Sequence, residues 1–154
     1  MEAPDIFLAG VIQGSERGHR IVAQDYRTTI KRAIAARLPG ATVYDPIEHH
    51  PGAIDYTLAE AHATFFGHIE LLRRSRLLVA YLPVASMGTS IEMWEAHHRG
   101  IPAVTISPLL ENWVIRLLSS VVCEDLAAFE RWIDGGGLEG FLEAAAAPAG
   151  RRGR

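Results

Sequence analysis

Glu92 is the acidic side chain whose surroundings in the sequence are best suited to chemistry. It ends a small polar stretch, Ser86-Met-Gly-Thr-Ser-Ile-Glu92, which comes directly after an apolar run at residues 77–82. The apolar run has the pattern of a strand buried on both faces of a parallel sheet, and the polar stretch has the pattern of a helix start. Because helix N-termini at strand ends bind anions, Ser86, Gly88 and Thr89 could hold an anion or a sugar hydroxyl beside this carboxylate.

The same residues also fit a structural role. Thr89-Ser-Ile-Glu92 has the spacing of a capping box. In such a box the Thr89 hydroxyl accepts from the backbone N–H of Glu92, and the Glu92 carboxylate accepts from the backbone N–H of Thr89. The spacing alone favours the cap, and it leaves the ligand site open as the alternative.

A second candidate site is the loop after the first expected strand, residues 6–10. Its sequence, VIQGSERGHR, contains Arg17, His19 and Arg20 among glycines and polar side chains, and Gly10 ends the strand before it. The loop has neither the Gly-Lys-Ser/Thr of a Walker motif nor the Gly-x-Gly-x-x-Gly of a dinucleotide site. It is therefore either a loop that binds a ligand or a solvated connection with glycines at its turns.

Histidine and cysteine give no further catalytic or metal-binding pattern. His62 and His68 are six residues apart and miss the i, i+4 spacing of a His-x-x-x-His pair, and none of the seven histidines is convincingly placed for chelation. We interpret His49 and His50 as solvated loop residues, and we expect no metal and no cofactor. The single Cys123 cannot form an internal disulfide, which agrees with a reducing compartment.

Length and composition limit the classes of protein. The 154 residues and the 49% hydrophobic content indicate one globular domain, which we place at residues 1–146 with a flexible tail at 147–154. No apolar run approaches the roughly 20 residues of a membrane helix, and the first residues lack the basic start of a signal peptide, so we expect a cytoplasmic protein. The net charge of −3 argues against a nucleic acid polymer as partner.

Short apolar runs alternate with helical patterns along the chain, and this alternation predicts the fold. Strands are expected at residues 6–10, 41–44, 77–82, 101–106 and 121–123. Helices are expected at residues 21–38, 56–74, 89–100, 107–119 with Ser107 as N-cap, 125–133 and 138–146, and a loop at 45–55. We therefore predict a doubly wound α/β fold, flavodoxin-like or Rossmann-like, with about five parallel strands and helices on both faces.

In these motifs the sequence resembles the nucleoside 2-deoxyribosyltransferase superfamily. The resemblance lies in the opening IFLAG strand and its loop, the LLVAYL strand, the stretch Ser86 to Glu92 and the Gly100-Ile-Pro turn, and it covers about residues 6–120. It implies a small doubly wound sheet in which Glu92 is a nucleophile that attacks the anomeric carbon of a nucleoside, expels the base and forms a covalent glycosyl ester. For this role Glu92 must be ionised near neutral pH, and we expect its helix N-terminus to favour that form.

The residue six positions before the glutamate bears on the substrate. Members of the superfamily that act on free nucleosides carry an acidic residue there, whereas the nucleoside 5′-monophosphate N-glycosidases carry a serine that contacts phosphate from a neighbouring subunit. Here it is Ser86, so the chain is most similar to the cytidylate hydrolases. By the same resemblance Arg17, His19 and Arg20 belong to a phosphate loop. Asn112 matches a residue that completes the neighbouring subunit's site, which implies a homodimer or a higher homo-oligomer with shared sites.

The function that the resemblance implies is hydrolysis of a nucleoside 5′-monophosphate to free base and sugar phosphate. One alternative is a 2-deoxyribosyltransferase that exchanges bases on deoxyribose. A second is a nucleotide-binding sensor without turnover, because His68 stands where members of the superfamily often have an aspartate.

Overall fold

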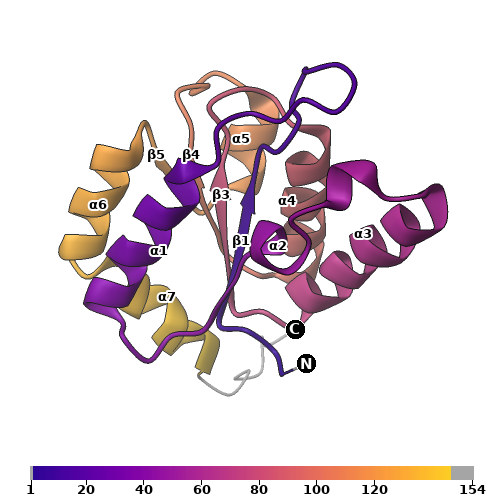
Figure 1. The fold of residues 1–154 in the computed structure, drawn as a ribbon. Helices are drawn as coiled ribbons and strands as arrows, with labels where there is room; N and C mark the ends of the chain where they lie inside the picture. The colour runs from indigo at the N-terminus through magenta and orange to yellow at the C-terminus, as the bar shows by residue number, and fades with distance from the viewer. Residues whose placement is uncertain (1, 147–154) are drawn as a thin grey trace.

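The computed structural model describes residues 2–146 of the chain, with side chains described through residue 143. At its centre is a parallel sheet with the strand order β2-β1-β3-β4-β5 (Figure 1). The strands are β1 (Ile6–Gly10), β2 (Val43–Tyr44), β3 (Leu77–Tyr81), β4 (Ala103–Ile106) and β5 (Val121–Cys123). The five parallel strands confirm the predicted doubly wound α/β class.

The chain changes direction across the sheet between β1 and β3. These two strands pair over five residues, from Ile6 opposite Leu77 to Gly10 opposite Tyr81. From β1 the chain crosses to β2 on one side, whereas from β3 it crosses to β4 on the other side. In open α/β sheets this reversal leaves a crevice at the carboxyl ends of the two strands, where ligands bind.

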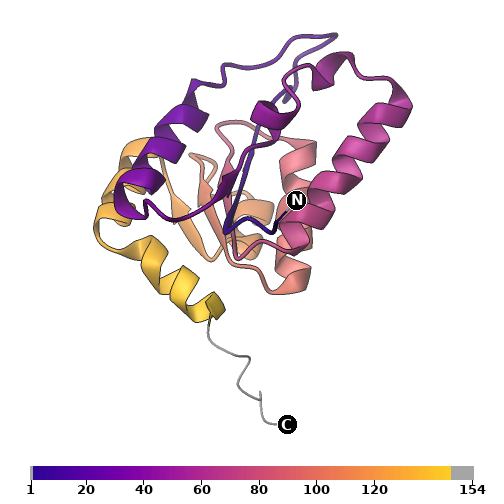
Figure 2. The ribbon, with the colours of Figure 1, turned by 60° about the horizontal axis from the view of Figure 1, so that its bottom comes forward.

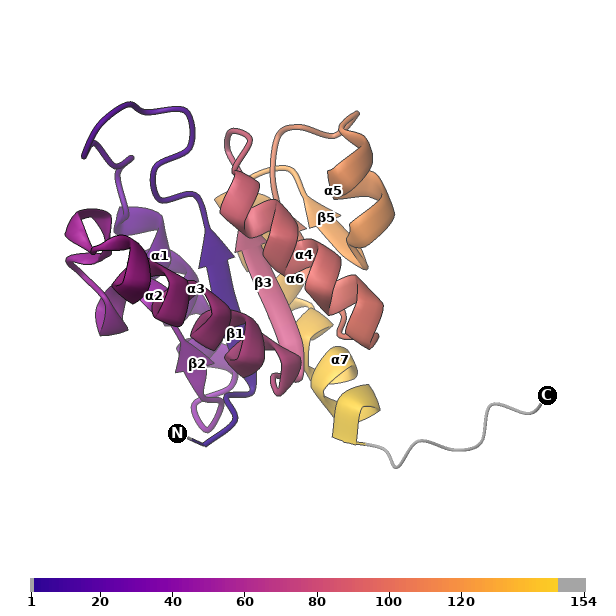
Figure 3. The ribbon, with the colours of Figure 1, turned by 90° about the vertical axis from the view of Figure 1, so that its right-hand side faces the viewer.

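Helices cover both faces of the sheet (Figures 1 and 2). One face is covered by α1 (Asp25–Arg37), α6 (Leu126–Asp134) and α7 (Gly137–Ala146), and the other by α3 (Leu58–Arg73), α4 (Met87–Arg99) and α5 (Trp113–Leu118). Figure 3 shows α3 and α4 lying across β1 and β3. This second layer therefore flanks the crevice at the strand ends.

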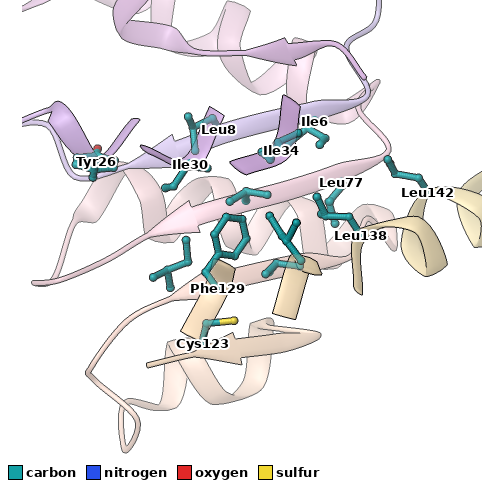
Figure 4. Packing of buried hydrophobic residues seen from close by; sticks show 14 residues of the cluster. Ile6, Leu8, Tyr26, Ile30, Ile34, Leu77, Cys123, Phe129, Leu138 and Leu142 are labelled. Atoms are coloured by element: carbon teal, nitrogen blue, oxygen red, sulfur yellow. The ribbon is translucent and has the colours of Figure 1, made fainter. Parts of the chain in front are cut away.

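Alternate side chains of the central strands enter two separate cores. Ile6 and Leu8 pack toward α1, and Figure 4 shows this cluster continuing through Phe129 of α6 to Leu138 of α7. Phe7 belongs to the cluster on the opposite face of the sheet. Each fully buried side chain of this size contributes about 1.5 to 3 kcal/mol, so both cores stabilise the strands that carry the crevice.

Several element boundaries differ from the predicted ones. The helix predicted from Ser107 begins only at Trp113, because Ser107 is buried and donates its hydroxyl to the carbonyl of Leu82 at 2.7 Å. Asn112 is the N-cap instead. The helix predicted from residue 21 begins at Asp25, after a segment in which Val22 donates its N–H to the Ile12 carbonyl at 2.8 Å.

The segment predicted as a loop at residues 45–55 contains two helical turns. They are α2 (Pro46–His49) and a 3₁₀ turn, η1 (Ala53–Asp55). Asp45 begins α2 by accepting from the N–H of Ile47 at 3.1 Å, and Pro46 occupies the first helical position. The predicted tail at 147–154 lies outside the described residues.

No helix in the described part of the chain is long and apolar enough to cross a membrane.

Candidate active site

The helix that carries Glu92 begins one turn earlier than predicted. Ser86 is the N-cap of α4, and its hydroxyl oxygen accepts from the N–H of Thr89 at 3.4 Å. Thr89 lies inside the helix and is buried, so the predicted capping box between Thr89 and Glu92 is wrong. Glu92 consequently lies in the second turn of the helix, where its side chain is not used to satisfy the helix end.

A pocket of about 290 Å³ lies at the carboxyl ends of β1 and β3, in front of Glu92. Five of the predicted site residues line it together: Gly10, Ser86, Gly88, Thr89 and Glu92. The remaining lining comes from β1 and the loop after it, from α1, from the turns before α3 and from α3 and α4: Ala9, Ile12, Gln13, Gly14, Arg27, Pro46, Ala53, Ile54, Phe65, His68 and Met87. The site is thus assembled from segments that are far apart in the sequence.

The Glu92 carboxyl has no partner within the described part of the protein. No described residue forms a hydrogen bond or an ion pair with it, although the side chain is half-buried. Burial raises the pKa of Glu92 to about 8, against the opposing effect of the positive charge of Arg27. A carboxyl in this state is available to a ligand.

The expectation that Glu92 is ionised near neutral pH is wrong for the protein without ligand. The favourable field of a helix N-terminus fades beyond the first turn, and Glu92 lies in the second. The loss of water around the carboxyl on burial therefore has the larger effect on the pKa of Glu92. With a pKa of about 8, most molecules hold a protonated Glu92 at pH 7.

Arg27 of α1 is the charged lining residue that the sequence analysis did not single out. Its side chain is buried and donates to the Asp45 carboxylate at 2.8 Å, to the carbonyls of Leu8 and Gly10 at 3.3 Å each, and to the Gln24 side chain at 2.7 Å. The sequence did contain a signal for Arg27, which was its position in the helical spacing of the apolar residues. Arg27 lies on the stripe that α1 buries, three residues before Ile30, where a charge requires a buried partner.

Gly10 has a packing requirement in addition to its place in the pocket. A Cβ atom at this position would clash with the Tyr26 hydroxyl, which donates to the Val11 carbonyl at 3.0 Å. Burial raises the pKa of Tyr26 to about 12. Tyr26 is thus a neutral packing residue, and it restricts the end of β1 to glycine.

The α3 side of the pocket carries an imidazole. His68 packs edge-on against His50 with ring centroids 5.2 Å apart, and its Nε2 atom is buried without a hydrogen-bond partner among the described residues. Burial and the neighbouring His50 and His49 lower the pKa of His68 to about 4, so its ring is neutral at pH 7.

The expectation of two solvated loop histidines is met in part: His49 is exposed but belongs to α2, and His50 lies in a loop but is half-buried. His49 stacks on Tyr44 with ring centroids 4.3 Å apart. His50 is half-buried, and its Nδ1 atom lies 3.0 Å from the Tyr56 hydroxyl. Both rings help to pack the turns that form the outer wall of the pocket.

Four predicted site residues do not line the pocket. Arg17, His19 and Arg20 are exposed on the loop after β1, and the Nδ1 atom of His19 lies 2.5 Å from an Asp55 carboxylate oxygen. Asn112 caps α5, where its side chain accepts from the N–H of Val114 at 2.9 Å. Their roles in binding phosphate or completing a second site stay predictions.

The pocket brings together three kinds of chemistry. The N-terminus of α4, with Ser86 and Gly88, can hold an anion; Glu92 can attack an electrophilic carbon; and the wall with Phe65 and His68 can pack against a planar ring and bond to its edge. No group of three or more metal-binding side chains occurs in the part of the chain that the structure describes.

Two solved structures share this fold. A 2-deoxyribosyltransferase from the psychrotolerant bacterium Bacillus psychrosaccharolyticus is 17% identical with a TM-score of 0.59, over 81% of this chain and 89% of that one. The CMP N-glycosidase BcmB of Clostridium botulinum is 18% identical with a TM-score of 0.53, over 85% of this chain and 98% of that one. No family model and no curated protein matches the sequence. The structural neighbours are therefore of the kinds that the sequence resemblance had indicated.

Proposed function

We propose that the protein cleaves the N-glycosidic bond of a nucleoside 5′-monophosphate and releases the free base and the sugar phosphate. The observation that carries the proposal is the unpartnered Glu92 carboxyl, which faces a pocket beside the N-terminus of α4. The fold supports it, because the similar solved structures are named as a 2-deoxyribosyltransferase and a CMP N-glycosidase.

Each part of the pocket has a role in this reaction. The phosphate is held by the Ser86 hydroxyl and by N–H groups around Gly88, since hydroxyl and backbone donors suit a dianion. The Glu92 carboxylate attacks the anomeric carbon, and the bond from that carbon to the base breaks with its electron pair moving to the base nitrogen. The base takes up a proton as it leaves. Water then attacks the anomeric carbon, releases the sugar phosphate and returns Glu92 to its free form.

The charge state of Glu92 determines the pH dependence of this reaction. The attacking form is the carboxylate, and the pKa of about 8 means that this form increases as the pH rises from 6 to 9. We expect kcat/KM to rise across this range with a midpoint near pH 8. A profile that is already flat above pH 5.5 would show that the reacting carboxyl has an ordinary pKa.

One assay separates the candidate functions. The protein is incubated with nucleosides and with 5′-monophosphates, with and without a second free base, and the products are separated by chromatography. Free base from a monophosphate without an acceptor supports the hydrolase. Base exchange that requires the acceptor indicates the transferase, and binding without any product indicates the sensor.

The working form in this proposal is a homodimer or higher homo-oligomer. Exposed apolar side chains gather on α4 and α5, where Met87, Trp113 and Leu117 are 83%, 77% and 69% exposed. Met87 also lines the pocket, so a second copy on this surface covers the open side of the site. Large apolar side chains left exposed on two neighbouring helices are typical of a protein–protein interface.

The oligomer is tested by placing charges on the apolar surface. Trp94→Glu combined with Trp113→Glu should reduce the mass measured by light scattering from a multiple of the chain mass to that of one chain. Ala36→Glu, at an exposed position of α1 on the opposite face, should leave the mass unchanged. A wild-type protein that is already a monomer at micromolar concentration contradicts this part of the proposal.

A further inference from the structure

We propose that the buried pair Arg27–Asp45 is a positioning element of this site, in which the guanidinium favours the charged form of Glu92 and Asp45 limits that effect. Neither residue was singled out by the sequence resemblance. The effect on turnover rests on the proposed function, whereas the effect on the charge of Glu92 can be measured without any substrate.

The contacts of Arg27 fix its charge at one place in the pocket wall. Its Nη1 atom donates to Asp45 and to the Leu8 carbonyl, and its Nη2 atom donates to the Gly10 carbonyl at the end of β1. Four hydrogen bonds thus bind the guanidinium to the middle and the end of β1, to Asp45 directly after β2 and to Gln24. Because a planar guanidinium with fixed partners cannot swing toward solvent, its field acts on the pocket in every molecule.

Few charges compete with Arg27 at the position of Glu92. Among the described residues that line the pocket, Arg27, His68 and Glu92 are the ones that can carry a charge, and the low pKa of His68 keeps its ring neutral. Arg27 is accordingly the charge that opposes burial in setting the pKa of Glu92. Farther along α4, Glu95 is paired with Arg99 of the same helix and with Arg73 of α3.

Asp45 moderates the guanidinium. It is buried, lies outside the pocket lining, and is also contacted by Lys31 at 3.2 Å on its solvent side. Without this carboxylate the charge of the guanidinium would act on Glu92 with no opposite charge beside it, and a carboxylate that is strongly stabilised by a positive charge attacks carbon less readily. With the Arg27–Asp45 pair in place, the Glu92 carboxyl can lose its proton, and no ion pair then neutralises its negative charge.

The proposal predicts opposite effects for the two partners. The carboxyl carbon of Glu92 is titrated by NMR in substrate-free protein labelled at glutamate carboxyl groups, with the signal assigned by its loss in Glu92→Gln. Arg27→Gln should move the midpoint to higher pH, and Asp45→Asn should move it to lower pH. If the midpoint moves up by one pH unit, turnover at pH 6.5 relative to the high-pH plateau falls about tenfold.

Controls separate this effect from damage to the fold. Arg37→Gln removes the same charge from an exposed position of α1 and should leave the midpoint unchanged. The double variant Arg27→Gln with Asp45→Asn leaves no buried charge unpaired, and it should also titrate above wild type. If a single variant does not fold, the midpoint of the double variant decides the test.

Two results overturn the inference. One is a Glu92 midpoint that stays at the wild-type value in both Arg27→Gln and the double variant. The other is a midpoint that falls in both, which is what opening of the site to water produces. A shifted midpoint in a protein that cleaves no nucleotide supports the charge coupling and contradicts only the proposed function.

Discussion

The two faces of the sheet are covered by helices with different outer surfaces. On the face of α1, α6 and α7, the large apolar side chains that the structure describes point inward to a core around Phe129. On the other face, α4 and α5 bury Met93 and Ile115 against the sheet but leave Trp94 and Trp113 exposed. Glu92 and Met87, which line the pocket, lie on α4 of this second face. The face of α1, α6 and α7 thus serves mainly the fold and contributes Arg27 to the pocket. The face of α3, α4 and α5 carries Glu92 and the exposed apolar side chains that we propose as an interface between copies of the chain.

The two faces also differ in how many polar and charged groups they bury. On the face of α1, α6 and α7, Glu139 pairs with Arg37 and has one buried oxygen without a hydrogen-bond partner among the described residues. The pocket and the wall behind it hold more such groups, namely the buried ion pair Arg27–Asp45, a neutral imidazole with an unpartnered nitrogen and a carboxyl with a raised pKa. Such groups are costly for stability unless they serve binding or reaction. We therefore expect variants in the core of α1, α6 and α7 to lower stability and keep activity. Variants at Glu92 should lower activity and keep or raise stability.

The largest effect is expected from Glu92→Ala. Removal of a covalent nucleophile should lower turnover by about 10⁴-fold, while the circular dichroism spectrum stays that of the wild type. The measurement is release of free base from the best monophosphate substrate. Turnover within tenfold of wild type would remove Glu92 from the mechanism and leave the pocket without a reacting group.

On the face of α1, α6 and α7, Phe129→Ala should act only on the fold. Phe129 is fully buried between the sheet, α1 and α7, so its truncation should lower the free energy of unfolding by about 3 to 5 kcal/mol. Denaturant unfolding gives this value. The remaining folded protein should keep the wild-type KM, and a strongly changed KM would show that the two faces are coupled.

Glu92→Gln should stabilise the protein while it removes activity. The pKa of Glu92 is about 8 in the folded protein, above its ordinary value, so the wild type loses stability as the pH rises from about 4.5 to 8. Glutamine does not titrate, so the Glu92→Gln variant does not lose stability in this way. We expect a gain on the order of 1 to 3 kcal/mol at pH 8 and little at pH 4.5, measured by thermal melts across this range. An equal gain at both pH values would rule out the titration of Glu92 as its cause.

The smallest effect is expected from Ser86→Asp. Aspartate is as good an N-cap as serine, so α4 should keep its stability within about 0.5 kcal/mol. Its charge repels a phosphate dianion, and KM for a 5′-monophosphate should rise roughly tenfold while KM for the free nucleoside stays the same. Ser86→Asn, which caps without charge, is the matched control. Equal KM changes for both substrates would place the phosphate elsewhere.

The sequence predicts the sheet well because its strands are short, apolar and separated by helical patterns. The bounds of β1 and β5 are those expected, and β3 differs by one residue at its end. The position of Glu92 beyond β3 followed from the same pattern, as did the grouping of Ser86 and Gly88 with it.

The parts that were missed depend on contacts between distant segments. Arg27 and Asp45 are 18 residues apart, and neither motif nor periodicity indicates that they pair beneath the pocket. The pKa of Glu92 depends on how much water the loop after β1 and the turns before α3 exclude, which only the assembled pocket shows. The start of α4 was misplaced because Ser86 and Thr89 both have the side chain of an N-cap, and packing decides between them.

The central claim is that Glu92 becomes bonded to the sugar during the reaction. It is tested by incubating the protein with a 5′-monophosphate that carries fluorine at the sugar 2′ position, which slows release of the glycosyl ester, followed by mass spectrometry of the digested protein. The account predicts that the peptide containing Glu92 gains the mass of the fluorinated sugar phosphate. Release of base with no labelled peptide, or with the label on another residue, would contradict it.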